Sequence, residues 1–203
     1  KPEGMQQGQR PVAVRVANKD RALPQRGLAA ADVVVEAVVE DGMTRLMAMY
    51  ADYNTVPQVG PVRSTQDAFV QMAMPSQAIM AYIDATVYAG NLLDVTGTKT
   101  VNGIQLGRTS FWFDTARSLP KPGGKLNEYC WFTDASLIWA GMTYLDILTT
   151  AEVHTLFQFS QQPAQSAGDA QIVNMRYSPV AEAGFVWNET TGLYDKHIFG
   201  HLH

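Results

Sequence analysis

The chain has 203 residues, of which 46% are hydrophobic, so it is long enough to bury a core, and one α/β domain is the default expectation. Its formal net charge of −4 and its 15 scattered Lys and Arg residues argue against a nucleic-acid partner. A single cysteine, Cys130, excludes an intramolecular disulfide and provides no thiolate cluster for zinc. No stretch reaches the roughly 18 to 20 continuous apolar residues that a membrane-spanning helix needs.

Residues 1–10 are polar and contain Gly and Gln, a composition typical of a linker. The sequence begins with Lys1 rather than Met, which a removed signal peptide would explain and a trimmed chain would explain equally well. We therefore expect a linker over 1–10, an α/β N-terminal domain over 11–150, and a β-rich C-terminal segment over 151–203 that could pack on the first domain.

The clearest local signal is a hairpin in the first quarter of the chain. Residues 11–17 alternate in character and predict a strand. Val33–Glu40 and Met43–Tyr50 are two apolar runs separated only by Asp41-Gly42, a dipeptide that accepts the positive φ angles of a type I′ turn. These runs predict a long two-stranded ribbon.

A helix is predicted directly after the ribbon. Ser64 offers a capping hydroxyl, Asp67 follows three residues later, and a helical pattern then continues to Pro75. Residues 78–83 follow and resemble a buried strand. Arg63 and Ser64 are therefore expected at a helix N-terminus.

The rest of the chain predicts further helices and a β-rich end. One helix is expected over 86–95, closed by Gly97, and another from Thr133 or Asp134 to about Leu148. The fold class is accordingly α/β of the mixed α+β kind, with a mixed sheet, a long Asp-Gly hairpin, flanking helices and a β-rich C-terminal part. The remaining predicted strands cover residues 155–160, 170–177, 184–187 and 193–199.

The first third of the chain contains five recognisable motifs: R-P-V-A-V at 10–14, L-P-Q-R-G-L at 23–28, A-D-V-V-V-E at 31–36, V-E-D-G-M-T-R at 39–45 and G-P-V-R-S at 60–64. In order and spacing they resemble those of a bacterial family of unknown function, the YerB-like lipoproteins. The chain resembles the family's N-terminal domain, with only the start of its C-terminal domain. The resemblance implies a secreted, lipid-anchored protein on the outer face of the bacterial cytoplasmic membrane, joined to the membrane only through an anchor upstream of Lys1.

The chain departs from the family pattern at two places. Tyr82 and Tyr129 begin segments in which relatives tend to have a histidine. Because a phenol with an ordinary pKa near 10 cannot replace a general base at neutral pH unaided, these departures put imidazole-dependent chemistry in doubt here.

Arg63 and Ser64 form the first candidate site. A guanidinium and a hydroxyl beside free backbone N–H groups at a helix N-terminus would bind a carboxylate or phosphate group. The alternative is that Ser64 only caps the helix and that Arg63 pairs with Glu36 or Glu40 across the hairpin.

The acids of the ribbon form the second candidate site. Glu36, Glu40 and Asp41 lie near Arg45 and could form a paired-acid or hard-cation site, although Asp41 is expected to bond to its own turn. Asp84 could line a cleft at the sheet edge or merely serve a turn. Ligand binding is thus assigned to Arg63, Ser64, Arg45, Glu36, Glu40, Asp41 and Asp84.

No nucleophile elbow, phosphate loop, dinucleotide fingerprint or zinc signature is present, so we expect no cofactor and no metal. Trp112, Trp131 and Trp139 lie in apolar runs and are predicted to be core. The favoured hypothesis is a binding domain for an anionic or glycan component of the cell envelope. The alternatives are an envelope hydrolase that cleaves glycan or phosphodiester bonds with the hairpin carboxylates, and a scaffold for other envelope proteins.

Overall fold

The computed structural model describes residues 8–154 and 170–202, which fall into two compact units. One unit comprises residues 1–36 and 45–156, and the other comprises residues 37–44 and 157–203. The first unit carries the large sheet and its helices. The second carries the C-terminal strands.

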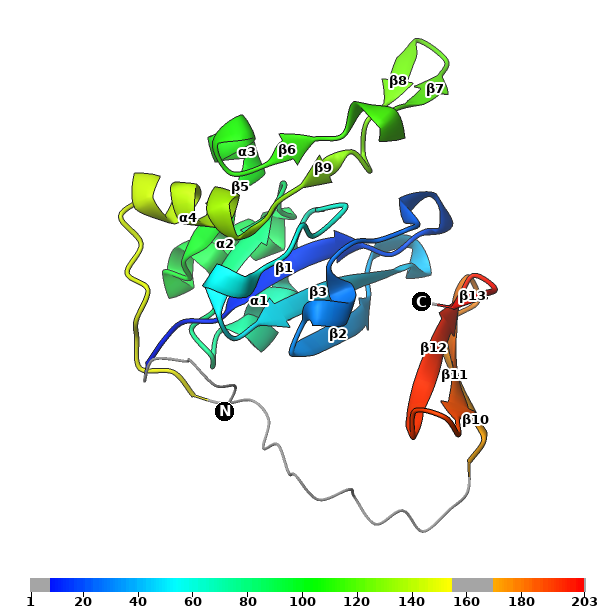
Figure 1. The fold of residues 1–203 in the computed structure, drawn as a ribbon. Coiled ribbons are helices and arrows are strands. Elements are labelled where there is room, and N and C mark those ends of the chain that lie inside the picture. The colour runs from blue at the N-terminus through cyan, green and yellow to red at the C-terminus, as the bar shows by residue number, and fades with distance from the viewer. Residues whose placement is uncertain (1–7, 155–169, 203) are drawn as a thin grey trace. The chain divides into compact units, whose positions relative to one another are not determined.

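A five-stranded mixed sheet forms the centre of the first unit, in the order β2-β3-β1-β4-β5 (Figure 1). Strand β1 is antiparallel to β3 and parallel to β4, and β4 is parallel to β5. The mixed sheet expected from the sequence is confirmed. The strands are β1 (Val12–Ala17), β2 (Val33–Val38), β3 (Thr44–Tyr50), β4 (Ile79–Tyr82) and β5 (Thr100–Asn102).

The turn between β2 and β3 has the predicted conformation. Asp41 and Gly42 both have positive φ angles, 60° and 71°. The Met43 N–H donates to the Glu40 carbonyl oxygen at 3.3 Å, and the Val39 N–H donates to the Met43 carbonyl oxygen at 2.7 Å. Two positive φ values and the first of these bonds are the signature of a type I′ turn, so the ribbon forms where the sequence predicts it.

Four α-helices of the described residues accompany the sheet. Thr86 caps α2, since its hydroxyl accepts from the Ala89 N–H at 3.3 Å, and Gly97 ends the helix in the left-handed conformation. Asp134 caps α4 in the same way, by accepting from the Leu137 N–H at 3.0 Å. Within residues 8–154 and 170–202, no helix is both long and apolar enough to cross a membrane. The α-helices are α1 (Asp67–Ala73), α2 (Val87–Thr96), α3 (Gly103–Leu106) and α4 (Ala135–Tyr144), and the 3-10 helices are η1 (Asp20–Ala22), η2 (Leu28–Ala30), η3 (Glu40–Gly42), η4 (Tyr53–Thr55), η5 (Gly107–Thr109) and η6 (Thr115–Arg117).

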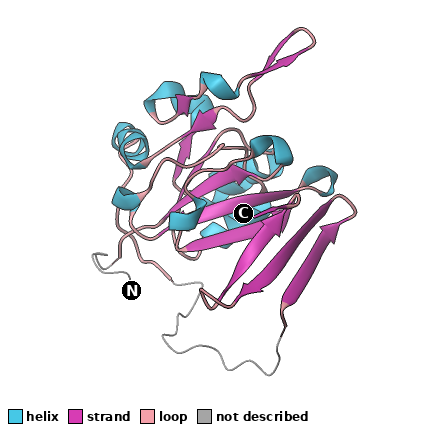
Figure 2. Ribbon diagram, turned by 45° about the vertical axis from the view of Figure 1, so that its right-hand side comes forward, coloured by secondary structure: helices cyan, strands magenta, loops and turns pink. Residues whose placement is uncertain are grey.

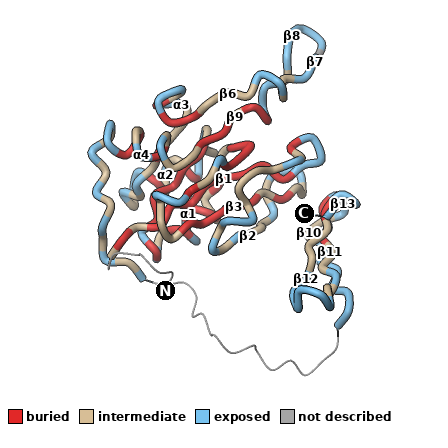
Figure 3. The backbone as a smooth tube through the Cα atoms, viewed as in Figure 1, coloured by how far each residue is buried: buried red, intermediate tan, exposed pale blue. Residues whose placement is uncertain are grey.

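Both faces of the sheet are covered, so its central strands are buried along their whole length (Figure 3). Val14 and Val16 belong to a core cluster that includes Ile138 of α4. Arg15 points to the opposite face, where it is fully buried with its guanidinium carbon 3.2 Å from the centre of the Phe69 ring of α1. Alternation along β1 therefore assigns α4 to one face and α1 to the other.

Two short ribbons extend the first unit beyond the sheet. β6 (Trp112–Phe113) pairs with β9 (Trp131–Phe132), and β7 (Leu119–Lys121) pairs with β8 (Gly124–Leu126) in an arm that stands away from the sheet (Figure 1). Cys130 lies just before β9 and is fully buried. Burial raises the pKa of its thiol, while the charge of Arg117 opposes the shift.

The second unit contains a four-stranded antiparallel sheet in the order β10-β11-β12-β13. Figure 2 draws the strands of the molecule in magenta. β10, β11 and β12 correspond to three of the four strands predicted after residue 150, the fourth prediction, over 155–160, lies outside the described residues, and β13 is not predicted. The α+β class with a β-rich C-terminal part is thus confirmed. The strands are β10 (Ile172–Ser178), β11 (Ala181–Asn188), β12 (Leu193–Ile198) and β13 (His201–Leu202).

Candidate functional site

Arg63 lies where two parallel strands separate. β1 and β4 pair directly as far as Val14 and Ala81, and beyond that point the chain at Arg63 enters between them. The Arg63 N–H donates to the Arg15 carbonyl oxygen at 3.0 Å, and the Ile83 N–H donates to the Arg63 carbonyl oxygen at 3.2 Å. Backbone bonds to both neighbours hold Arg63 at the carboxyl ends of these strands, the usual place for ligand sites in α/β sheets.

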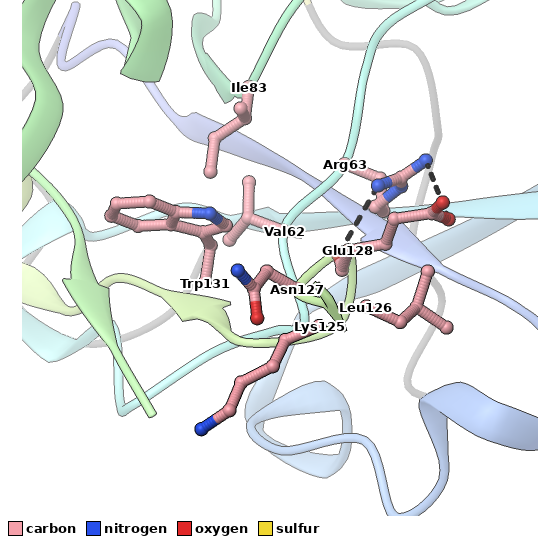
Figure 4. Close-up of a pocket in the computed structure, with 8 residues that line it drawn as sticks. All are labelled: Val62, Arg63, Ile83, Lys125, Leu126, Asn127, Glu128 and Trp131. Carbon is pink, nitrogen blue, oxygen red and sulfur yellow. Dashed lines mark hydrogen bonds and ion pairs between the residues drawn. The ribbon is translucent and has the colours of Figure 1, made fainter. Parts of the chain in front are cut away.

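A pocket of about 330 Å³ opens beside this residue, and we call it the carboxyl-end pocket (Figure 4). Arg63 and Glu128 lie together at one side of it, and the indole of Trp131 lies at the other. The pocket is lined by Val62, Arg63, Ile83, Lys125, Leu126, Asn127, Glu128 and Trp131. Charged groups, an amide, an aromatic ring and aliphatic side chains thus share one cavity.

Charge in the carboxyl-end pocket is partly balanced. The Arg63 Nη2 lies 3.5 Å from the Glu128 Oε2, and its Nη1 donates to the Glu128 carbonyl oxygen at 3.3 Å. Their side chains are 27% and 47% exposed, so water screens the pair, and such pairs contribute about 0–1 kcal/mol. A ligand anion can therefore compete with Glu128 for the guanidinium at small cost. Lys125 adds a second positive charge to the lining.

Trp131 provides the aromatic wall. Its ring meets Phe113 edge to face, with the ring centres 4.9 Å apart, and this contact comes from the antiparallel pairing of β6 with β9. The residue is half-buried and lines the pocket, so it is not wholly the core residue that the sequence predicts. The polar pair Asn127-Glu128, three and four residues earlier, is the sequence signal that its surroundings are not uniformly apolar.

Beneath the pair of Arg63 and Glu128 lies the buried residue Tyr129. The guanidinium carbon of Arg63 is 5.7 Å from the centre of its ring. Burial and the neighbouring Glu128 carboxylate raise the pKa of this phenol, and Arg63 opposes them. The phenol is therefore neutral at physiological pH and does not act as a base there.

Ser64 does not cap a helix. Helix α1 begins at Asp67, preceded by Gln66, and the Ser64 hydroxyl instead accepts from Arg45 Nη1 at 2.5 Å. The same guanidinium nitrogen donates to the Ser64 carbonyl oxygen at 3.1 Å. The prediction that Ser64 caps the helix is thus wrong, because a side chain from the neighbouring strand β3 bonds to its hydroxyl, whereas anion binding at Arg63 and Ser64 stays a prediction.

The predicted acids have separate environments. Glu36 accepts from the Asn18 amide at 2.9 Å, whereas Glu40 and Asp41 are exposed in the turn of the ribbon. Asp84 has a positive φ of 70°, and its carboxylate accepts from the next N–H, that of Ala85, at 2.8 Å. None of the four lines the carboxyl-end pocket, whose one acidic lining residue is Glu128. In the described part of the chain no three His, Cys, Asp or Glu residues are grouped to hold a metal ion.

Comparison with known families identifies the chain. A family model described as "Protein of unknown function (DUF3048) N-terminal domain" matches residues 1–144. The chain belongs to the DUF3048 family. The matched DUF3048 residues include Arg63 and the entire lining of the carboxyl-end pocket.

A sequence match and a structural match, both to YerB of Bacillus subtilis, agree with the resemblance seen in the sequence. The chain is 36% identical over 104 residues to "Putative lipoprotein YerB" of Bacillus subtilis (strain 168), an alignment that covers 51% of the chain and 31% of that protein. It also matches the crystal structure of YerB protein from Bacillus subtilis with a TM-score of 0.78 and 25% identity, over 96% of the chain and 62% of that structure. The chain therefore spans about a third of the curated relative and less than two thirds of the solved one. These matches confirm the YerB-like assignment.

Proposed function

We propose that this DUF3048 domain belongs to an extracytoplasmic, lipid-anchored cell-envelope protein and that its carboxyl-end pocket binds an acidic sugar of the envelope. The anchoring is suggested by the lipoprotein name of the Bacillus subtilis relative. The ligand class comes from the pocket itself. The observation on which it rests is that Trp131 and Arg63 line the same cavity.

Each lining group contributes a recognisable interaction. An indole wall offers a flat apolar surface to the C–H groups of a sugar ring, as aromatic residues in glycan sites do. Asn127 offers an amide that both donates and accepts hydrogen bonds to hydroxyls. Arg63 offers a planar guanidinium that can bind a carboxylate through two parallel bonds. An acidic sugar combines all three features in one small ligand.

Hydrolysis is a weaker hypothesis for this pocket. Glycosidases generally place two carboxyl groups about 5 to 10 Å apart across the scissile bond. The lining contains one acid, Glu128, and that acid is paired with Arg63. We therefore propose binding without catalysis.

The test is a titration of the isotope-labelled chain with N-acetylmuramic acid, a carboxylated sugar of peptidoglycan, with N-acetylglucosamine as the uncharged control. We expect the amide signals of Arg63 and of Asn127 to Trp131 to shift as the acidic sugar is added. The neutral sugar should bind with an affinity at least about 10-fold lower, because the carboxylate contact is worth about 1.4 kcal/mol or more.

Two substitutions with opposite expected signs sharpen the test. Arg63→Gln should weaken binding about 10-fold, whereas Glu128→Gln should strengthen it about threefold, because it removes the carboxylate that competes for the guanidinium. Arg108→Ala, at an exposed arginine outside the lining, should change nothing. Equal weakening by both pocket variants would indicate that the pair only supports the fold, and identical affinity for the two sugars would refute the proposal.

A further inference from the structure

A second pocket lies at the other end of the parallel strands, and we call it the amino-end pocket. It has a volume of about 240 Å³, equivalent to roughly eight waters at about 30 Å³ each. The Ile79 N–H donates to the Pro11 carbonyl oxygen, and the Met80 N–H donates to the Lys99 carbonyl oxygen, so Arg10 and Lys99 flank the start of β4. The lining consists of Arg10, Met74, Pro75, Gln77, Ala78, Thr96, Thr98 and Lys99.

The lining of the amino-end pocket is positively charged and contains no acid. Arg10 donates from Nη1 to the Gln77 carbonyl oxygen at 2.9 Å, and its Nε is buried without a hydrogen-bond partner in the described part of the chain. Burial also lowers the pKa of this guanidinium, which remains charged at neutral pH. Lys99 is exposed, and its ammonium group is free to turn toward a ligand.

Two helix ends offset part of this positive charge. Helix α1 ends at Ala73, next to the lining residue Met74, and α2 ends at the lining residue Thr96. Each helix C-terminus carries roughly half a negative charge, so the two together offset about one of the two cations. About one positive charge remains in a chain whose net charge is −4.

Neutral donors complete the site. The Thr96 hydroxyl donates to the Leu92 carbonyl oxygen at 2.7 Å and lies 2.7 Å from the Thr98 hydroxyl. Because the Thr96 proton is already used, the Thr98 hydroxyl can either donate to Thr96 or turn toward a ligand. One guanidinium, one ammonium and one rotatable hydroxyl are the donors that a phosphate group requires.

We propose that the amino-end pocket binds a phosphate group through Arg10, Lys99 and Thr98. The group can belong to a small soluble phosphate compound or to the head group of a phospholipid, since both present the same oxygens. This site is separate from the carboxyl-end pocket and does not depend on the function proposed for it.

The first experiment uses inorganic phosphate as the probe, with sodium chloride adjusted to hold ionic strength constant. Amide signals of residues 77, 98 and 99 should shift in a saturable manner with phosphate and remain unchanged with chloride alone. Lys99→Gln should weaken the phosphate affinity at least about fivefold, and Arg10→Lys should weaken it as well because lysine lacks the planar fork. Lys19→Gln, at an exposed lysine outside the lining, is the matched control and should have no effect.

The second experiment distinguishes the two sources of phosphate. The full chain is sedimented with vesicles of phosphatidylglycerol and, separately, of phosphatidylcholine. If the chain sediments with phosphatidylglycerol, and Lys99→Gln reduces this while Lys19→Gln does not, the ligand is a phospholipid head group. If the chain does not sediment but its signals still shift saturably with phosphate, the ligand is a soluble phosphate compound. Phosphate shifts that do not saturate, or that Lys99→Gln leaves unchanged, would overturn the proposal.

Discussion

The two pockets of the first unit lie at opposite ends of the same parallel strands, and they differ in both charge and construction. At the carboxyl ends, the wall is built from inserted segments and short ribbons, the arginine faces an acid, and an indole is present. At the amino ends, the wall is built from helix ends and the start of a strand, and the lining contains two cations, no acid and no aromatic side chain.

If both proposed ligands bind, this difference predicts two modes of recognition on one scaffold. A pocket whose lining combines an indole with two cations and one acid would select by stacking as well as by charge. A pocket with surplus positive charge and no aromatic wall selects by charge. The predictions below test whether the two ends are as independent as their construction suggests.

The largest expected effect concerns the support of the carboxyl-end pocket. Phe132 of β9 is fully buried, stacks on Trp112 with ring centres 5.1 Å apart, and lies under the Arg26 guanidinium at 4.7 Å. Phe132→Ala should lower the free energy of unfolding by about 3–5 kcal/mol in a urea titration, because it removes a buried ring and leaves a cavity. Val95→Ala, at a valine on α2 that is 86% exposed, should cost less than about 0.5 kcal/mol, and a comparable loss there would contradict this picture of the core.

A smaller expected effect is a difference between the two pockets in how strongly ligand affinity depends on ionic strength. Raising the salt concentration from 0.01 M to 1 M shortens the screening length from about 30 Å to about 3 Å. Phosphate affinity at the amino-end pocket should fall by about 10-fold or more, whereas binding of N-acetylmuramic acid should fall by a smaller factor, because salt screens its carboxylate contact but not its stacking on Trp131. Equal salt dependence at both ends, measured by isothermal titration, would remove the distinction.

The smallest effect is a pH dependence of the unfolding free energy, which involves Asp52 near the amino end of β1. Burial acts to raise the pKa of Asp52, but hydrogen bonds from the Asn54 N–H, the Gln9 amide and the Asn54 amide outweigh it and lower the pKa from its ordinary value. A carboxyl whose pKa is lower in the folded state contributes stability above its unfolded pKa and loses it as the pH falls through the folded value.

Asp52→Asn should therefore reduce the difference in unfolding free energy between pH 7 and pH 3, as measured by urea titration at each pH. Asp94→Asn, at an exposed acid on α2, serves as the control. If both variants keep the wild-type pH dependence, the bonds to Asp52 do not stabilise this end of the molecule.

The sequence predicts the elements whose signals are local. Asp41-Gly42 specifies its turn through two residues that tolerate positive φ, and Thr86 and Gly97 mark the two ends of α2. Asp134 marks the start of α4 because its side chain caps the helix, although this helix ends at Tyr144, before the expected Leu148. In each case one or two neighbouring residues carry the whole signal.

The site depends on contacts that no local pattern records. The partner of Arg63 is Glu128, 65 residues away, and the hydroxyl of Ser64 is taken by Arg45 from another strand. Gln9 and Arg10 fall in the stretch that composition assigns to a linker, yet Gln9 is buried and Arg10 lines a pocket. Composition reports average polarity, whereas these positions depend on where β1 begins and on which chain segment lies beside it.

The lone thiol of this chain has a practical consequence. Cys130 is enclosed by the fold, and its pKa is raised, so little of the reactive thiolate forms at neutral pH. A cysteine introduced at a surface position can therefore be coupled to a fluorophore or spin label while the native sulfur stays unmodified. Probes placed beside either pocket can thus be attached site-selectively to the otherwise unaltered protein.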